Sequence, residues 1–128
     1  MSVATTQGIR VEVRSEYRPD RSAPAGQRFL FTYTVRLTNE GTEPARLVSR
    51  HWFITDAHGV QEEVRGEGVV GQQPRLAAGE TFEYSSFCIL KTPFGAMRGT
   101  YQMVRDGGGG GFDAVIAPFS LAIPGSVN

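Results

Sequence analysis

Apolar and polar residues alternate along most of this chain, which is typical of β-strands that are buried on one face only. Between residues 9 and 17, for example, Ile9, Val11 and Val13 alternate with arginine and glutamate residues. Glycine and proline residues separate successive runs, and no segment shows the spacing of an amphipathic helix. The pattern therefore predicts seven antiparallel strands, at about residues 9–17, 29–38, 45–56, 60–65, 81–88, 97–104 and 114–123.

Seven short antiparallel strands without a helix favour an all-β, two-sheet antiparallel sandwich of the immunoglobulin or fibronectin type III kind over a closed barrel. Trp52 lies within the third predicted strand, and we expect its large apolar side chain at the centre of the core. Residues 39–42, Asn-Glu-Gly-Thr, are suited to a tight reversal. They predict that strands 29–38 and 45–56 form a hairpin.

Two strands differ in what their side chains predict about position in a sheet. The strand at 60–65 carries Glu62, Glu63 and Arg65, and such charges are common on edge strands. We expect the strand at 81–88 to lie in the interior, where Cys88 would be a buried thiol with a raised pKa.

Length and charge restrict the domain count and the kind of partner. A chain of 128 residues predicts a single domain, with a core from about residue 8 to residue 124. Thirteen Lys and Arg residues balance thirteen Asp and Glu residues, which gives a formal net charge of zero. This balance disfavours nucleic-acid binding, which depends on a positive surface.

The same composition bears on location. No apolar run approaches the roughly 20 residues that span a bilayer, and the N-terminus has no basic and apolar leader. The single cysteine excludes an internal disulfide. We therefore expect a cytoplasmic protein without a membrane span.

A glycine-rich segment at 65–75 contains Gly66, Gly68 and Gly71 in the spacing Gly-x-Gly-x-x-Gly. In a dinucleotide-binding unit this spacing precedes a helix whose N-terminus holds a pyrophosphate. Pro74 follows too soon for such a helix, so that interpretation fails.

Two interpretations of this segment remain. In the first, its backbone N–H groups form an anion-binding turn that binds phosphate together with Arg65 and Arg75. In the second, the glycines only permit bulges or positive φ angles, while Val69 and Val70 close the end of the sandwich.

Metal-binding and catalytic groups are sparse. The two histidines, His51 and His58, are predicted on a strand surface and at an exposed turn, without the spacing of a transition-metal site. Asp56, Glu62 and Glu63 offer at most a weak, hydrated divalent-cation site. No nucleophile stands beside a base, so we expect no enzyme activity and no cofactor.

Three segments are distinctive in combination: Arg50-His51-Trp52-Phe53-Ile54-Thr55-Asp56, residues 63–74 and residues 92–103. Together they resemble the ApaG family, and the resemblance extends from about residue 8 to residue 124. It implies a fibronectin type III-like sandwich and an association with cobalt resistance and magnesium efflux. The family's domain also occurs in eukaryotic F-box and polymerase-interacting proteins, which implies an interaction module.

From these observations we expect a non-enzymatic protein-interaction or regulatory module linked to Co²⁺ and Mg²⁺ homeostasis. Its partner would be a protein of unknown identity, with an anion or a weakly held divalent cation as a regulator. The alternative is a phosphate-, pyrophosphate- or nucleotide-binding protein, or a phosphohydrolase, that uses the loop at 65–75.

Overall fold

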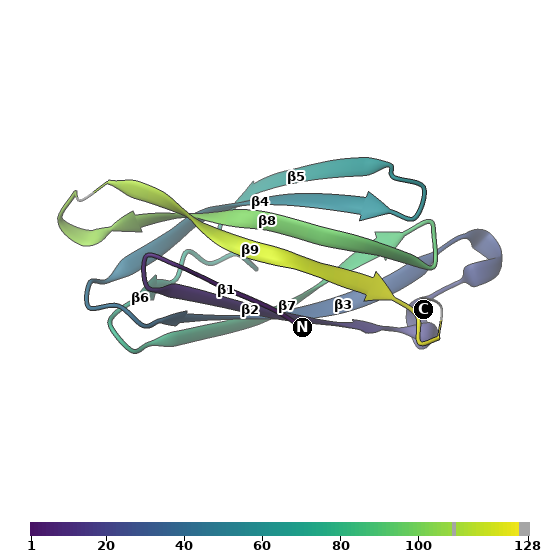
Figure 1. Ribbon diagram of the computed structural model, residues 1–128, viewed down its shortest axis with the longest axis horizontal. Helices are drawn as coiled ribbons and strands as arrows, with labels where there is room; N and C mark the ends of the chain where they lie inside the picture. The colour runs from purple at the N-terminus through teal and green to yellow at the C-terminus, as the bar shows by residue number, and fades with distance from the viewer. Residues whose placement is uncertain (109, 126–128) are drawn as a thin grey trace.

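The computed structural model describes residues 1–108 and 110–125, and they form a sandwich of two antiparallel sheets (Figure 1). One sheet has the strand order β1-β2-β3-β7, and the other has the order β5-β4-β8-β9 with β6 also paired to β4. No helix among these described residues is long and apolar enough to cross a membrane. The strands are β1 (Ser2–Thr6), β2 (Ile9–Tyr17), β3 (Phe29–Asn39), β4 (Ala45–Asp56), β5 (Gln61–Glu67), β6 (Arg75–Leu76), β7 (Thr81–Leu90), β8 (Phe94–Arg105) and β9 (Gly111–Ala122), and the 3₁₀ turns are η1 (Pro19–Arg21), η2 (Pro24–Gly26) and η3 (Asp106–Gly108).

The all-β sandwich predicted from the alternation is confirmed, together with all seven predicted strands. Two short strands were not predicted. β1 pairs with β2 at the N-terminus, and β6 pairs with β4 over two residues. Both lie at sheet edges, where a few residues add to an existing ladder without a long alternating run of their own.

The prediction that strands 29–38 and 45–56 form a hairpin is wrong. β3 pairs with β2 and β7, whereas β4 lies in the other sheet. The buried Asn39 amide explains the change of sheet: its Nδ2 donates to the carbonyl oxygens of Glu43 and Leu76, and its Oδ1 accepts the N–H of Gly41. These bonds turn the chain out of the first sheet and allow each strand to bury one face against the other.

The edge position predicted for strand 60–65 is confirmed, because β5 pairs only with β4. The interior position predicted for strand 81–88 is wrong, because β7 is the terminal strand of its sheet. Phe87 and Ile89 of this strand are 59% and 39% exposed, although both are large apolar residues. Apolar type alone does not reveal that a strand has only one neighbour.

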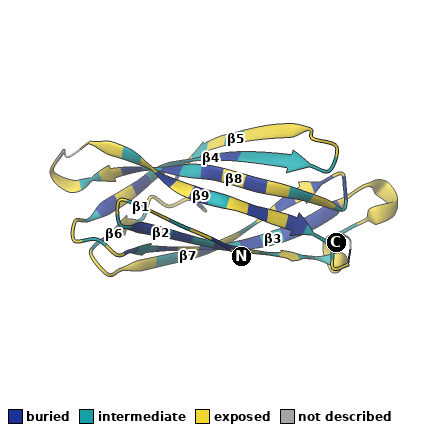
Figure 2. Cartoon of the chain, in the orientation of Figure 1, coloured by how far each residue is buried: buried dark blue, intermediate teal, exposed yellow. Residues whose placement is uncertain are grey.

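The core lies between the sheets, and Figure 2 shows buried and exposed positions alternating along β8 and β9. Trp52 is 2% exposed, which confirms its predicted core position. Its ring packs edge-on against the rings of Tyr33, Tyr101 and Phe119, which come from both sheets. This aromatic cluster joins the two layers.

The two long sides of the sandwich differ. On one side β9 packs against β1 and β2 of the opposite sheet, and the Thr6 hydroxyl accepts the backbone N–H of Val115. On the other side the edges are β5 and β7, and these two strands make no comparable contact within the described part of the chain. The sandwich is therefore closed along β1 and β9 and open along β5 and β7.

Candidate functional site

The open side contains a cleft between the sheets, which we call the open seam. It has two lobes of about 320 and 270 Å³ that share Tyr33, Arg50 and Ser86. The first lobe is also lined by Glu67, Val69, Val70, Gly71 and Tyr84, and the second by Trp52, Ile54, Glu62, Val64, Phe87, Cys88, Ile89 and Met97.

A β-bulge in β4 places Arg50 inside this seam. Leu47 pairs with Met103 and Ser49 with Gln102, so Val48 is an extra residue in the β4 strand. The extra residue reverses the alternation of faces, which turns Arg50 to the inner face with Trp52. Arg50 lies two residues before Trp52, so alternation from this core tryptophan predicts that Arg50 also faces inward, but Arg50 was not among the predicted site residues.

The Arg50 guanidinium is held by backbone carbonyls and not by a carboxylate. Its Nη1 donates to the carbonyl oxygens of Glu67 at 3.1 Å and Gly68 at 2.7 Å. A Cβ at residue 66 would lie 2.6 Å from Nη2, so Gly66 leaves the space that the guanidinium occupies. Among the described residues, no carboxylate lies within ion-pair distance of Arg50. A partly buried, unpaired cation is therefore available in the seam.

The tyrosine hydroxyls in and beside the seam are protonated at neutral pH. Burial raises the pKa of Tyr33, and it raises the pKa of Tyr84 and Tyr101 further. The hydroxyls of Tyr84 and Tyr101 form a hydrogen bond with each other. The buried Trp52 Nε1 has no hydrogen-bond partner among the described groups, and such donors are rare in protein interiors.

Cys88 contributes a thiol to the second lobe. It is buried and free, as predicted, and burial followed by the nearby Glu62 charge raises its pKa to about 11. The thiolate is the reactive form of cysteine. Cys88 is therefore a small apolar group at neutral pH.

The glycine-rich segment forms a tight turn next to Arg50. Gly68 and Gly71 have φ angles of +62° and +78°, and Val69 is buried whereas Val70 is exposed. The N–H of Gly68 donates to Val48 O. The N–H groups of Val69 and Gln72 donate to the carbonyl oxygens of Gln72 and Val69, respectively. These three N–H groups stabilise the turn, so they are not free to bind an anion. The geometry therefore favours the second interpretation, in which the glycines only permit bulges or positive φ angles.

The two arginines that flank the segment do not converge. Arg65 is 73% exposed on β5 opposite His51, with its Nη2 3.6 Å from a Glu63 carboxylate oxygen. Arg75 lies on the short β6 strand, opposite Arg46 of β4. Its guanidinium donates two hydrogen bonds to Asp106, at 2.9 and 2.5 Å. Phosphate binding by Arg65, Gly66, Gly68, Gly71 and Arg75 stays a prediction, and this arrangement gives it little support.

The two histidines lie at the surface, on a strand and at a turn, as predicted. His51 lies on the outer face of β4, with Nε2 3.0 Å from Glu63 Oε2, and this hydrogen bond lowers the pKa of Glu63. Asp56 accepts the N–H groups of His58 and Val60 and so stabilises the β4–β5 turn. Within residues 1–108 and 110–125, no three His, Cys, Asp or Glu side chains are grouped as metal ligands.

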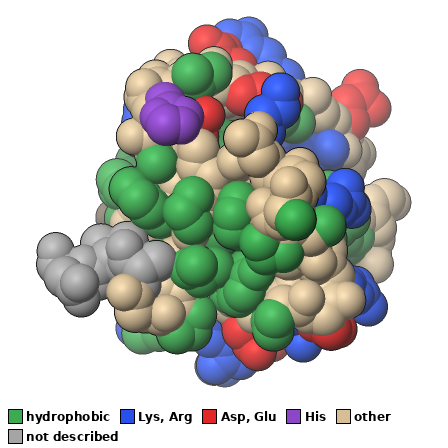
Figure 3. Space-filling view, turned by 90° about the vertical axis from the view of Figure 1, so that its right-hand side faces the viewer, with side chains coloured by type: hydrophobic (Ala, Val, Ile, Leu, Met, Phe, Trp, Pro, Cys, Tyr) green, Lys and Arg blue, Asp and Glu red, His purple; other side chains and the backbone are tan. Residues whose placement is uncertain are grey.

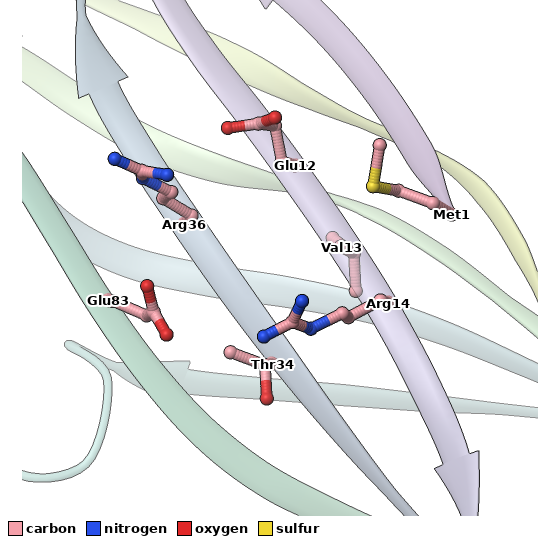
Figure 4. Close-up of a pocket in the computed structure, with 7 residues that line it drawn as sticks. All are labelled: Met1, Glu12, Val13, Arg14, Thr34, Arg36 and Glu83. Atoms are coloured by element: carbon pink, nitrogen blue, oxygen red, sulfur yellow. The ribbon is translucent and has the colours of Figure 1, made fainter.

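A second depression, of about 110 Å³, lies on the outer face of the β1-β2-β3-β7 sheet (Figure 4). Arg14 extends over β3 towards Thr34, and Arg36 lies opposite Glu83 on the paired strand β7 (Figure 4). With Glu12 also in the lining, two arginines face two glutamates. The balanced charges and the exposed sheet surface make this depression a weaker candidate than the open seam.

Apolar side chains gather at the end of the sandwich where β7 ends and β8 begins (Figures 1 and 3). The exposed Ile89 is near the end of β7, Phe94 begins β8, and Val60 lies in the β4–β5 turn. Contiguous exposed apolar surface of this kind often marks an interaction site. It adjoins the end of the β7 edge.

Known proteins share both this sequence and this fold. The ApaG domain model matches residues 19–105. The chain is 65% identical over 128 residues to Protein ApaG of Anaeromyxobacter dehalogenans strain 2CP-C, with both chains covered completely, and 54% identical over 116 residues to Protein ApaG of Bordetella pertussis strain Tohama I, which covers 91% of this chain and 88% of that protein. A crystal structure from Bordetella pertussis of a protein named ApaA superposes with a TM-score of 0.89 and 53% identity, over 92% of this chain and 95% of the other. With a match over most of its length and a shared fold, this chain belongs to the ApaG family.

Proposed function

We propose that this protein is a non-enzymatic interaction module that binds a segment of a partner protein by adding a strand to β7. The observation that carries the proposal is the free edge of β7, a ten-residue strand that ends its sheet beside the open seam. The unpaired backbone groups of such an edge bind extended peptides in several known recognition modes.

The edges of the two sheets differ in how well they resist strand addition. β5 carries Glu62, Glu63 and Arg65, which disfavour pairing with another strand. β1 and β9 pack against each other across the closed side. β7 instead presents the exposed Phe87 and Ile89, which would pack against an added strand.

The chemistry of the open seam supports a binding role without catalysis. Its thiol and tyrosine hydroxyls have raised pKa values and stay protonated at neutral pH. The residues that line its two lobes include no histidine to act as a base. A link to Co²⁺ and Mg²⁺ homeostasis stays a prediction, and under this proposal it would operate through a bound partner.

Peptides selected on the full-length chain from a random-peptide phage library test the proposal. Their affinities are measured by fluorescence anisotropy for the wild type, for Phe87→Lys on β7 and for Val115→Lys on β9, which is the matched control because Val115 is 44% exposed on the closed side. We expect Phe87→Lys to weaken binding about tenfold or more and Val115→Lys to leave it unchanged, since a lysine disfavours strand addition only at the edge that is used. Equal affinities for all three proteins, or no enriched peptide, would contradict the proposal.

A further inference from the structure

We propose that Arg50 selects the partner strand by its charge: an acidic side chain enters the open seam and forms a bidentate ion pair with the guanidinium. This inference rests on the proposed strand addition at β7 and names the chemistry of the segment that is added. The partner is a protein segment that carries an aspartate or glutamate between apolar residues.

Strand register brings the acidic side chain to Arg50. In β7, Tyr84, Ser86 and Cys88 face the other sheet, whereas Phe87 and Ile89 face outward. A strand paired with β7 continues the same alternation, so its residue opposite Ser86 points inward. Ser86 and Arg50 line both lobes of the open seam. That inward side chain therefore enters the space next to the guanidinium.

Arg50 lacks the counter-ion that such a position normally has. One of its terminal nitrogens is bonded to two backbone carbonyls, and no described carboxylate lies within ion-pair distance of the others. A planar guanidinium offers parallel N–H donors that match a carboxylate. A Cβ at residue 66 would lie 2.6 Å from Nη2, so a glycine there leaves the space in which the guanidinium lies.

A monoanion suits this site better than a phosphate group. The turn N–H groups of Gly68, Val69 and Gln72 are bonded to carbonyls, so the guanidinium is the only formal positive charge among the seam's lining residues. Glu62 and Glu67 also line the lobes, and their charges oppose a polyanion more strongly than a single carboxylate.

β7 also determines which residues of the added strand can flank the acidic residue on the outer face. Residues of the added strand that lie on the outer face would contact Phe87 and Ile89, the exposed apolar residues near the end of β7. Apolar and β-branched residues fit this face. The expected segment alternates apolar residues outward with an acidic residue inward.

The test uses the peptides selected from the phage library on the full-length wild-type chain. We expect them to share an acidic residue between apolar residues. For one selected peptide, the acidic residue is replaced by its amide, and both peptides are titrated against wild type and Arg50→Gln. The amide change is expected to weaken binding to wild type about tenfold, as for a charge-assisted hydrogen bond, and to have no further effect on Arg50→Gln. If Arg50→Gln does not fold, the wild-type comparison still tests the acidic preference, and displacement by acetate or phosphate tests the kind of anion that the seam binds.

Three outcomes would overturn the inference. They are peptides without an acidic preference, an amide effect that persists in Arg50→Gln, and displacement of the acidic peptide by inorganic phosphate or pyrophosphate but not by acetate at equal concentration. If the acidic preference is absent while Phe87→Lys still weakens binding, strand addition stands and only the role of Arg50 fails. If Phe87→Lys has no effect, strand addition itself fails.

Discussion

Both long sides of the sandwich are bounded by edge strands, but one side is closed and the other is open. On the closed side, β9 packs against β1 and β2, and buried residues such as Ile116 and Leu121 point into the core. On the open side, β5 and β7 leave a seam that holds an arginine, two tyrosines and a cysteine. The closed side is built for stability, whereas the open side exposes both a free edge and an unpaired charge.

The difference arises from local features of β4. The bulge at Val48 turns Arg50 inward, and the Val48 carbonyl accepts bonds from Gly68 N and from Gln73 Nε2. The glycine-rich turn is thereby fixed beside the guanidinium. The glycines of the Gly-x-Gly-x-x-Gly spacing thus help to position Arg50, which lies outside that motif.

The largest expected effect concerns the aromatic cluster that joins the sheets. Trp52→Ala is expected to lower the free energy of unfolding by about 3–5 kcal/mol, because it removes a buried indole that contacts three other rings. Phe87→Ala at the open edge is the control and is expected to change it by no more than about 0.5 kcal/mol. Urea denaturation measures both, and a similar loss for the two variants would break the distinction between core and edge.

Alkaline pH is expected to destabilise the protein through the buried groups of the seam. The folded-state pKa values of Cys88, Tyr33, Tyr84 and Tyr101 are raised above their ordinary values, which are 9.0 for cysteine and 10.0 for tyrosine. The unfolded chain therefore loses these protons first, so stability is complete below about pH 9 and falls as the pH rises above it, by up to about 1.4 kcal/mol per pH unit for each group.

Urea denaturation between pH 7 and pH 11 measures this dependence, and the double variant Tyr84→Phe with Tyr101→Phe is the control. We expect the control to show a shallower alkaline decline than wild type. A free energy of unfolding that stays constant to pH 11 would be inconsistent with buried, neutral hydroxyls in the seam.

A smaller effect is expected in the turn beside Arg50. Gly68→Ala would place a Cβ 2.3 Å from the Gln72 carbonyl oxygen at a φ of +62°, so a loss of about 1–3 kcal/mol is expected. Gly59→Ala is the matched control, since Gly59 has a φ of +82° with open space around it, and about 1 kcal/mol is expected there. Thermal unfolding compares them, and a more stable Gly68→Ala variant would show that the turn is not constrained.

The smallest effect is expected at Arg75. Its ion pair with Asp106 is exposed, and such pairs contribute little to stability. Arg75→Ala is expected to leave both the melting temperature and peptide binding unchanged. Weaker peptide binding by this variant would indicate that the binding site lies near β6 and not in the open seam.

Much of the fold could be predicted from the sequence, because alternation reports which face of a strand is buried. It identified all seven long strands and placed Trp52 in the core. It does not report which strands are neighbours. The hairpin expected at 39–42 and the interior position expected for strand 81–88 failed for this reason, since both depend on pairing between distant segments.

The candidate site was harder to predict. Arg65 and Arg75 flank the glycines in sequence, but their partners in the structure are Glu63 and Asp106. Arg50 lies 16 residues before Gly66, and only the pairing of β4 with β5 brings them together. The alternation from Trp52 would have indicated that Arg50 points inward, but not that it lacks a counter-ion.

Amide-resolved hydrogen exchange of the full-length chain, with and without a selected peptide, tests the central claim most directly. The account predicts that the peptide slows exchange at amides of β7 (Thr81–Leu90) and leaves β9 (Gly111–Ala122) unchanged, because the new backbone bonds form only at the open edge. Slowed exchange in β9, or a bound peptide that protects no amide of β7, would contradict it.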